Sequence, residues 1–82
     1  MENLVSLTKY LVKQVIDDEN SFSVKLLDND DESILIEVLV SSSLIGKIIG
    51  KNGKMALSIR NIVQAAAYNN NIKKVKINFD AF

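Results

Sequence analysis

The 82-residue sequence contains no cysteine, no histidine, no proline and no tryptophan. Without cysteine there is no disulfide framework and no thiol nucleophile, and without histidine there is no imidazole base. A zinc site of the usual Cys/His kind is excluded for the same reason. Most enzyme mechanisms use one of these groups, so we expect that the protein is not an enzyme. We also expect no catalytic residue, metal site, cofactor or small-molecule substrate.

Long hydrophobic runs are also missing. The longest apolar stretches, such as residues 34–36 and 38–40, are far shorter than the roughly 20 residues that span a bilayer. Glu2 and Lys9 interrupt the apolar segment that a signal peptide at the N-terminus would need. We therefore expect a cytoplasmic protein without membrane insertion.

The composition is that of a packed domain, with 48% apolar and 24% charged residues. A chain of this length makes one small domain at most, and we expect it to cover residues 1–82. The formal net charge is zero, but residues 17–43 carry −7 and residues 44–82 carry +6. Clustered lysine and arginine is the electrostatic signature of a nucleic-acid-binding surface. On charge alone, two solvated faces are the simpler interpretation.

Periodicity predicts the first half of the chain. Apolar residues recur at helical spacing from Leu4 to Val15, and the polar run at 17–21 ends this helix. Alternation over 22–27 and again over 34–40 predicts two strands joined by an acidic loop from 28 to 32.

The second half begins with three serines at 41–43, which are good capping residues for a short helix at 44–49. A longer helix is predicted at 54–68, ended by the asparagines at 69–71, and a third strand follows at 75–79. The order αββααβ predicts an α+β fold, a three-stranded sheet with helices packed on one face.

The most informative segment is the run I-I-G-K-N-G-K at 48–54, which joins the two predicted helices. Glycine lets the backbone approach a ligand closely, and the following helix directs its free N–H groups and its positive dipole end at the loop. Lys51 and Lys54 add full charge, so the loop suits a phosphodiester backbone. The glycine spacing matches neither the dinucleotide-binding motif nor the P-loop. The plain alternative is that the two glycines only form a tight turn.

This run matches the I-I-G-x-x-G signature, and the chain resembles a type II K-homology (KH) domain. With Ile59-Arg60 and the alanines at 65–67 behind it, the chain is similar to the small stand-alone bacterial KH proteins of the KhpA family. The resemblance implies a cytoplasmic RNA-binding protein that acts as an RNA chaperone in post-transcriptional regulation. It also implies a role in cell elongation, division and cell shape. A second, larger KH protein with an additional nucleic-acid-binding domain is an implied partner.

By position, the resemblance assigns the grip on single-stranded RNA to the loop and the groove wall to isoleucines before it. The edge of the strand at 34–40 would form the opposite wall, and the acidic loop at 28–32 would repel RNA if it leaned over the groove. The predicted RNA-binding residues are Gly50, Lys51, Asn52, Gly53, Lys54, Lys47, Ile45, Ile48, Ile49 and Arg60.

A second hypothesis starts from Leu35 and Leu39, which alternate with the core positions of their strand. They would form a small exposed apolar strip on the other face of the sheet, which suggests a subunit interface. The alternative function is therefore a protein-interaction or dimerisation module with a KH-like fold and weak RNA binding, in a homodimer or heterodimer.

Overall fold

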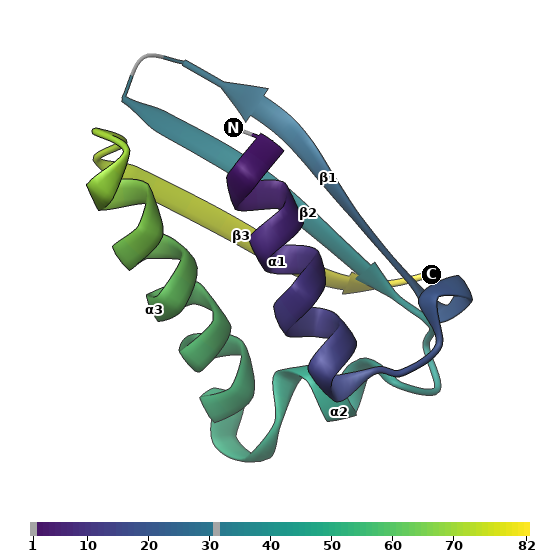
Figure 1. Ribbon diagram of the computed structural model, residues 1–82. Coiled ribbons are helices and arrows are strands. Elements are labelled where there is room, and N and C mark those ends of the chain that lie inside the picture. The colour runs from purple at the N-terminus through teal and green to yellow at the C-terminus, as the bar shows by residue number, and fades with distance from the viewer. Residues whose placement is uncertain (1, 31) are drawn as a thin grey trace.

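The computed structural model describes residues 2–30 and 32–82, with the side chains described from Leu4 onward, and it confirms the predicted αββααβ order (Figure 1). Two single 3₁₀ turns are added to that order. The elements are α1 (Glu2–Val15), η1 (Glu19–Ser21), β1 (Phe22–Asn29), β2 (Ser33–Val40), α2 (Ile45–Ile49), η2 (Lys51–Gly53), α3 (Lys54–Asn69) and β3 (Lys74–Ala81). No helix in the described part of the chain is long and apolar enough to cross a membrane.

The three strands form one mixed sheet in the order β1-β2-β3, in which β2 is antiparallel to β1 and parallel to β3. The helices α1 and α3 cover one face of this sheet, as predicted (Figure 1). Because side chains alternate along a strand, β2 buries every second residue against the helices and turns Leu35, Glu37 and Leu39 to the uncovered face. The buried set of β2 is Ile34, Ile36, Val38 and Val40.

The helices complete the core with one stripe each. On α1, Thr8 is buried among apolar residues, and its hydroxyl donates to the backbone oxygen of Leu4 at 2.7 Å, which satisfies the polar group. On α3, Met55 and Ile62 are apolar residues at helical spacing, but both remain exposed. The buried stripe of α3 is Ala56, Ile59, Val63 and Ala67.

The acidic connection between β1 and β2 is shorter than predicted, because β1 continues to Asn29 and β2 begins at Ser33. The Asp30 carboxylate accepts hydrogen bonds from the backbone N–H groups of Glu32 and Ser33 and from the Ser33 hydroxyl. These bonds lower the pKa of Asp30, and the bond from the Glu32 N–H has the largest effect. This turn therefore stays negatively charged at neutral pH. Asp31 lies outside the described residues.

The prediction that serines cap α2 is wrong. Leu44 occupies the N-cap position, and no side chain caps this helix. The backbone N–H of Ser41 instead donates to Ser21 and extends the β1–β2 ladder. At the other end of the helical region the prediction is confirmed, since Asn71 adopts the left-handed conformation with φ of 64° just after α3.

One polar side chain ties α3 to β3. The Gln64 side-chain oxygen accepts from the Val75 backbone N–H at 3.0 Å, and its nitrogen donates to the Lys73 carbonyl at 3.3 Å. The side chain therefore fixes where β3 begins relative to α3, and with it the position of the glycine loop at the opposite end of α3.

Candidate nucleic-acid interface

The loop between α2 and α3 has a backbone that only particular residues adopt. Gly50 has φ 78° and ψ 175°, a region that is essentially restricted to glycine. A Cβ at this position would lie 2.6 Å from the Met55 Cβ. Asn52 and Gly53 are left-handed, with φ values of 58° and 76°. Asparagine tolerates this conformation better than most residues, so the sequence K-N-G fits the turn.

The loop presents the start of α3 to solvent. Gly53 is the N-cap of this helix and supplies no side chain, so no side-chain cap occupies the first-turn N–H groups. A helix of 16 residues also directs the positive end of its dipole at the loop. An anion placed here meets backbone donors and a favourable field together.

Three lysines belong to the segments that meet at this helix start. Lys47 on α2, Lys51 in the loop and Lys54 at the beginning of α3 are all exposed. Neither of the two ion pairs among the described residues involves any of them. The acidic β1–β2 turn lies at the far end of α3, where the Glu32 carbonyl accepts from the Lys73 N–H (Figure 1). The acidic turn therefore does not lean over the loop.

Of the three residues of α2 that were predicted to line the groove, two keep accessible surface and one does not. Ile45 and Ile49 are partly buried and keep some accessible surface beside the loop. Ile48 has 0% exposure and packs in the core, so its assignment to the groove wall is wrong. A helix of five residues makes little more than one turn, and only its inward position is fully covered.

The predicted opposite wall also requires correction. β2 is the central strand and is paired on both sides, so it has no free edge to offer. Among the strands, β3 has the most extensive contact with α2, and its Phe79 is partly buried against the core. The sequence pattern contains no signal for this, because alternation reveals a strand's faces and not its neighbours in the sheet.

Arg60 lies away from the loop itself. It is exposed on α3, one helical turn before Gln64, whose side chain reaches β3. Residues four apart share a helix face, so Arg60 lies on the flank of α3 next to β3. The structure therefore does not bring Arg60 together with the glycine loop, although both belong to the α2–α3 region.

The two leucines assigned to an interface lie on the uncovered face of the sheet, as predicted, but they are half-buried rather than exposed. In the ladders Leu35 is opposite Asp28 and Lys76, and Leu39 is opposite Ser23 and Asp80. Neighbouring polar side chains therefore cover part of the apolar strip.

The αββααβ order, the mixed three-stranded sheet and the two-glycine loop between α2 and α3 together define a KH domain of type II topology. The family model of the KhpA/KhpB KH domain matches residues 6–79, and the chain belongs to this family.

Its relatives include the RNA-binding protein KhpA of Borreliella burgdorferi, which is 35% identical over 69 residues, covering 84% of this chain and 83% of the relative. The RNA-binding protein KhpA of Clostridium perfringens is 38% identical over 69 residues, covering 84% of this chain and 91% of the relative.

Among solved structures, the fold is similar to part of Era. One is Aquifex aeolicus Era bound to GDP and AlF4⁻, with a TM-score of 0.72 and 17% identity. Another is Era with MgGDPNP and nucleotides 1506–1542 of 16S ribosomal RNA, with a TM-score of 0.72 and 18% identity. Both matches cover 96% of this chain, which spans 30% of each Era chain, and at this identity they show a shared fold alone.

Proposed function

We propose that this protein binds single-stranded RNA at the loop from Gly50 to Gly53 and breaks no bond in it. The observation that carries the proposal is the loop backbone, which leaves the start of α3 without a side-chain cap and surrounds it with lysines that have no described ion-pair partner. Relatives in the KhpA family bear the name RNA-binding protein, which supports the same ligand.

In this proposal a backbone phosphate sits against the N–H groups that remain free at the loop, since those of Gly50, Gly53 and Lys54 donate to carbonyls within the turn. The side chains of Lys47, Lys51 and Lys54 supply charge around it. Unpaired bases then lie on the accessible surfaces of Ile45 and Ile49. Phosphate contacts give affinity and position, while base contacts give the selectivity. A single KH domain holds about four nucleotides, so we expect modest sequence preference.

We further propose that residues 1–82 act as one KH domain without catalytic activity. A cytoplasmic location, RNA chaperoning, a larger KH partner and a role in cell elongation and division stay predictions of the family resemblance.

The test changes the charge of the loop without changing its backbone. The double variant carries Lys51→Asp and Asn52→Asp. Aspartate, like asparagine, tolerates the left-handed conformation that position 52 adopts. Fluorescence anisotropy with a labelled single-stranded RNA pool should show affinity reduced roughly tenfold or more, because a phosphate contact is replaced by repulsion. Circular dichroism checks that the variant is folded.

The matched control is Lys74→Asp with Asn78→Asp, which makes the same two replacements on the uncovered face of the sheet. Lys74 lies beside Asp30 and Glu32, where RNA is already disfavoured by charge. We expect this control to bind RNA like the wild-type protein. Equal affinity of the loop variant and the wild type, or equal losses in loop variant and control, would contradict the proposed site.

Self-association through the uncovered sheet face is a separate proposal, supported by the accessible surface that Leu35 and Leu39 retain there. Replacing both with lysine should convert a dimer to a monomer in light scattering, because the apolar contact is lost. Glu37→Lys changes the charge between them, removes no leucine and should leave the dimer intact. A wild-type monomer, or a dimer that survives the double replacement, would rule this interface out.

A further inference from the structure

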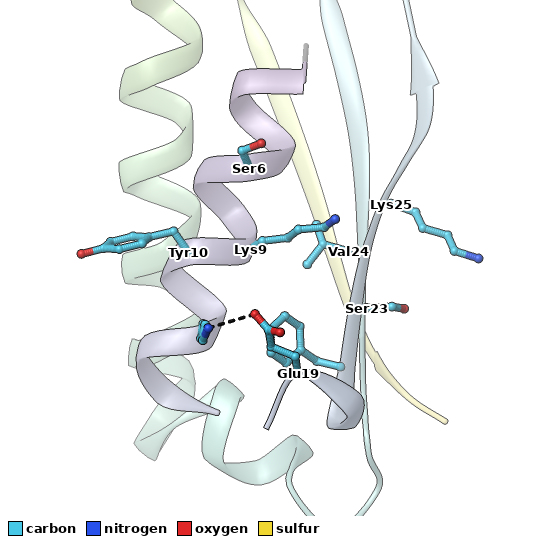
Figure 2. Close-up of a pocket in the computed structure, with 9 residues that line it drawn as sticks. Ser6, Lys9, Tyr10, Glu19, Ser23, Val24 and Lys25 are labelled. Atoms are coloured by element: carbon cyan, nitrogen blue, oxygen red, sulfur yellow. Dashed lines mark hydrogen bonds and ion pairs between the residues drawn. The ribbon is translucent and has the colours of Figure 1, made fainter. Parts of the chain in front are cut away.

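A cavity of about 520 Å³ lies between α1 and β1, on the side of the sheet away from β3 (Figure 2). Its volume is within the range of small-ligand sites. The residues that the argument uses are Ser6, Lys9 and Lys13 of α1, Glu19 of η1, and Phe22 and Val24 of β1. The proposed RNA site involves none of them.

The cavity includes the free edge of the sheet. Opposed residues in an antiparallel pair alternate between hydrogen-bonded and non-bonded positions. The Ser41 N–H donates to the Ser21 carbonyl, so these two residues form a hydrogen-bonded pair. The next pair along the ladder, Phe22 and Val40, is therefore a non-bonded pair, and so is Val24 with Val38. The backbone groups of Phe22 and Val24 therefore point away from β2, toward the cavity edge, where their N–H groups are available as donors and their C=O groups as acceptors.

The side chains at this edge are mainly donors. Lys9 extends from α1 toward Val24, and Ser6 adds a hydroxyl one turn earlier (Figure 2). Lys9 belongs to neither of the ion pairs found in the described residues. Lys13 pairs with Glu19 at 2.9 Å, but both side chains are more than half exposed. Such a pair contributes little and can be exchanged for another anion.

An occupant that meets the side chains of Ser6, Lys9 and Lys13 supplies acceptor oxygens and negative charge at more than one point. Lys9 and Lys13 are about 6 Å apart along α1 at 1.5 Å per residue. A phosphodiester chain carries a charged acceptor at every nucleotide and can meet both lysines. The position also fits, because α2 contacts the loop-bearing α3 on one side and α1 on the other (Figure 1).

We propose that this cavity is a second contact site for the RNA backbone, used by strands that extend beyond the nucleotides held at the glycine loop. The inference rests on the proposed function, since it needs an RNA already bound at the loop. Lys9 and Lys13 bind phosphates, and Glu19 limits the affinity by competing for Lys13.

The test compares labelled random-sequence RNA pools of about four and about 15 nucleotides, of which only the longer extends beyond the four-nucleotide site. The variant is Lys9→Gln with Lys13→Gln, and the control with the same charge change is Lys74→Gln with Lys76→Gln. For the longer RNA, the Lys9/Lys13 variant should bind roughly fivefold more weakly at about 50 mM salt, while the control binds like wild type.

The salt dependence provides a second readout. Each lost phosphate contact on single-stranded nucleic acid lowers the log–log slope by about 0.7, so the Lys9/Lys13 variant should lose about 1.4 in slope with the longer RNA. With the shorter RNA, affinity and slope should be those of wild type. Glu19→Gln should strengthen binding of the longer RNA by about twofold, because Lys13 loses its competing anion.

An unchanged slope and affinity of the Lys9/Lys13 variant for the longer RNA overturns the inference. If the same variant instead loses binding to polyglutamate that wild type shows, the cavity serves an acidic protein segment, which also overturns it. Failure of the proposed function is separate, since it appears as normal binding of the shorter RNA by the variant Lys51→Asp with Asn52→Asp.

Discussion

Replacing Ile48 with alanine is expected to lower the free energy of unfolding by about 2–5 kcal/mol, because the side chain is fully buried and its removal leaves a cavity. For a chain of this length the total stability is roughly 4–12 kcal/mol, so the loss is a large part of it. Urea denaturation followed by circular dichroism measures the change as a lower midpoint with a similar slope.

Ile45→Ala on the same helix is the matched comparison. Ile45 is only partly buried, so its replacement should cost roughly 1 kcal/mol, less than half of the Ile48 effect. The effects on RNA affinity should have the opposite order. When both proteins are folded, the Ile45→Ala variant should bind RNA more weakly than the Ile48→Ala variant. If the Ile48→Ala protein had unchanged stability and reduced RNA affinity, Ile48 would line the groove and its assignment to the core would be wrong.

Replacing Gly50 with alanine should cost about 3 kcal/mol or more. The backbone angles at Gly50 are strained for any residue with a Cβ, and this strain alone costs about 1–3 kcal/mol. The added carbon also lies 2.6 Å from the Met55 Cβ and 2.9 Å from its backbone nitrogen, so the start of α3 has to shift. The measurement is again the urea midpoint.

The other two glycines separate these causes. Gly53 also has positive φ but nothing within 4 Å of its ideal Cβ, so Gly53→Ala should cost about 1–2 kcal/mol from strain alone. Gly46 lies inside α2 with equally open space, and Gly46→Ala should stabilise the protein by up to about 1 kcal/mol. Equal effects at Gly50 and Gly53 would show that α3 moves without cost.

The separation of charge along the chain becomes a separation in space. The acidic turn between β1 and β2 and the lysines of the loop lie at opposite ends of α3 (Figure 1). A 16-residue helix is about 24 Å long, more than two Debye lengths at physiological salt. The acidic turn is therefore screened from an anion at the loop, and a net charge of zero is compatible with the proposed RNA binding.

Sequence patterns predicted the helices and strands well because each of these elements depends mainly on residues that are close together in the chain. Alternation in β2 identified the buried Ile36 and Val38, and the asparagine run correctly marked the end of α3. The same patterns failed for α2, where five residues are too few to define a stripe and Ile48 could not be distinguished from Ile49. The serines before α2 failed as caps because Ser41 is bound into the sheet.

The sequence by itself determined the order of the elements, the α+β class, the buried face of β2 and the loop that defines the family, since periodicity and glycine positions are properties of neighbouring residues. Only the tertiary structure decided that β2 is the central strand, that Ile48 is inside, that the acidic turn lies far from the loop, and that the free edge of β1 lies beside the lysines of α1. These facts depend on which elements pack together, and contacts between residues distant in sequence leave no periodic trace in the chain.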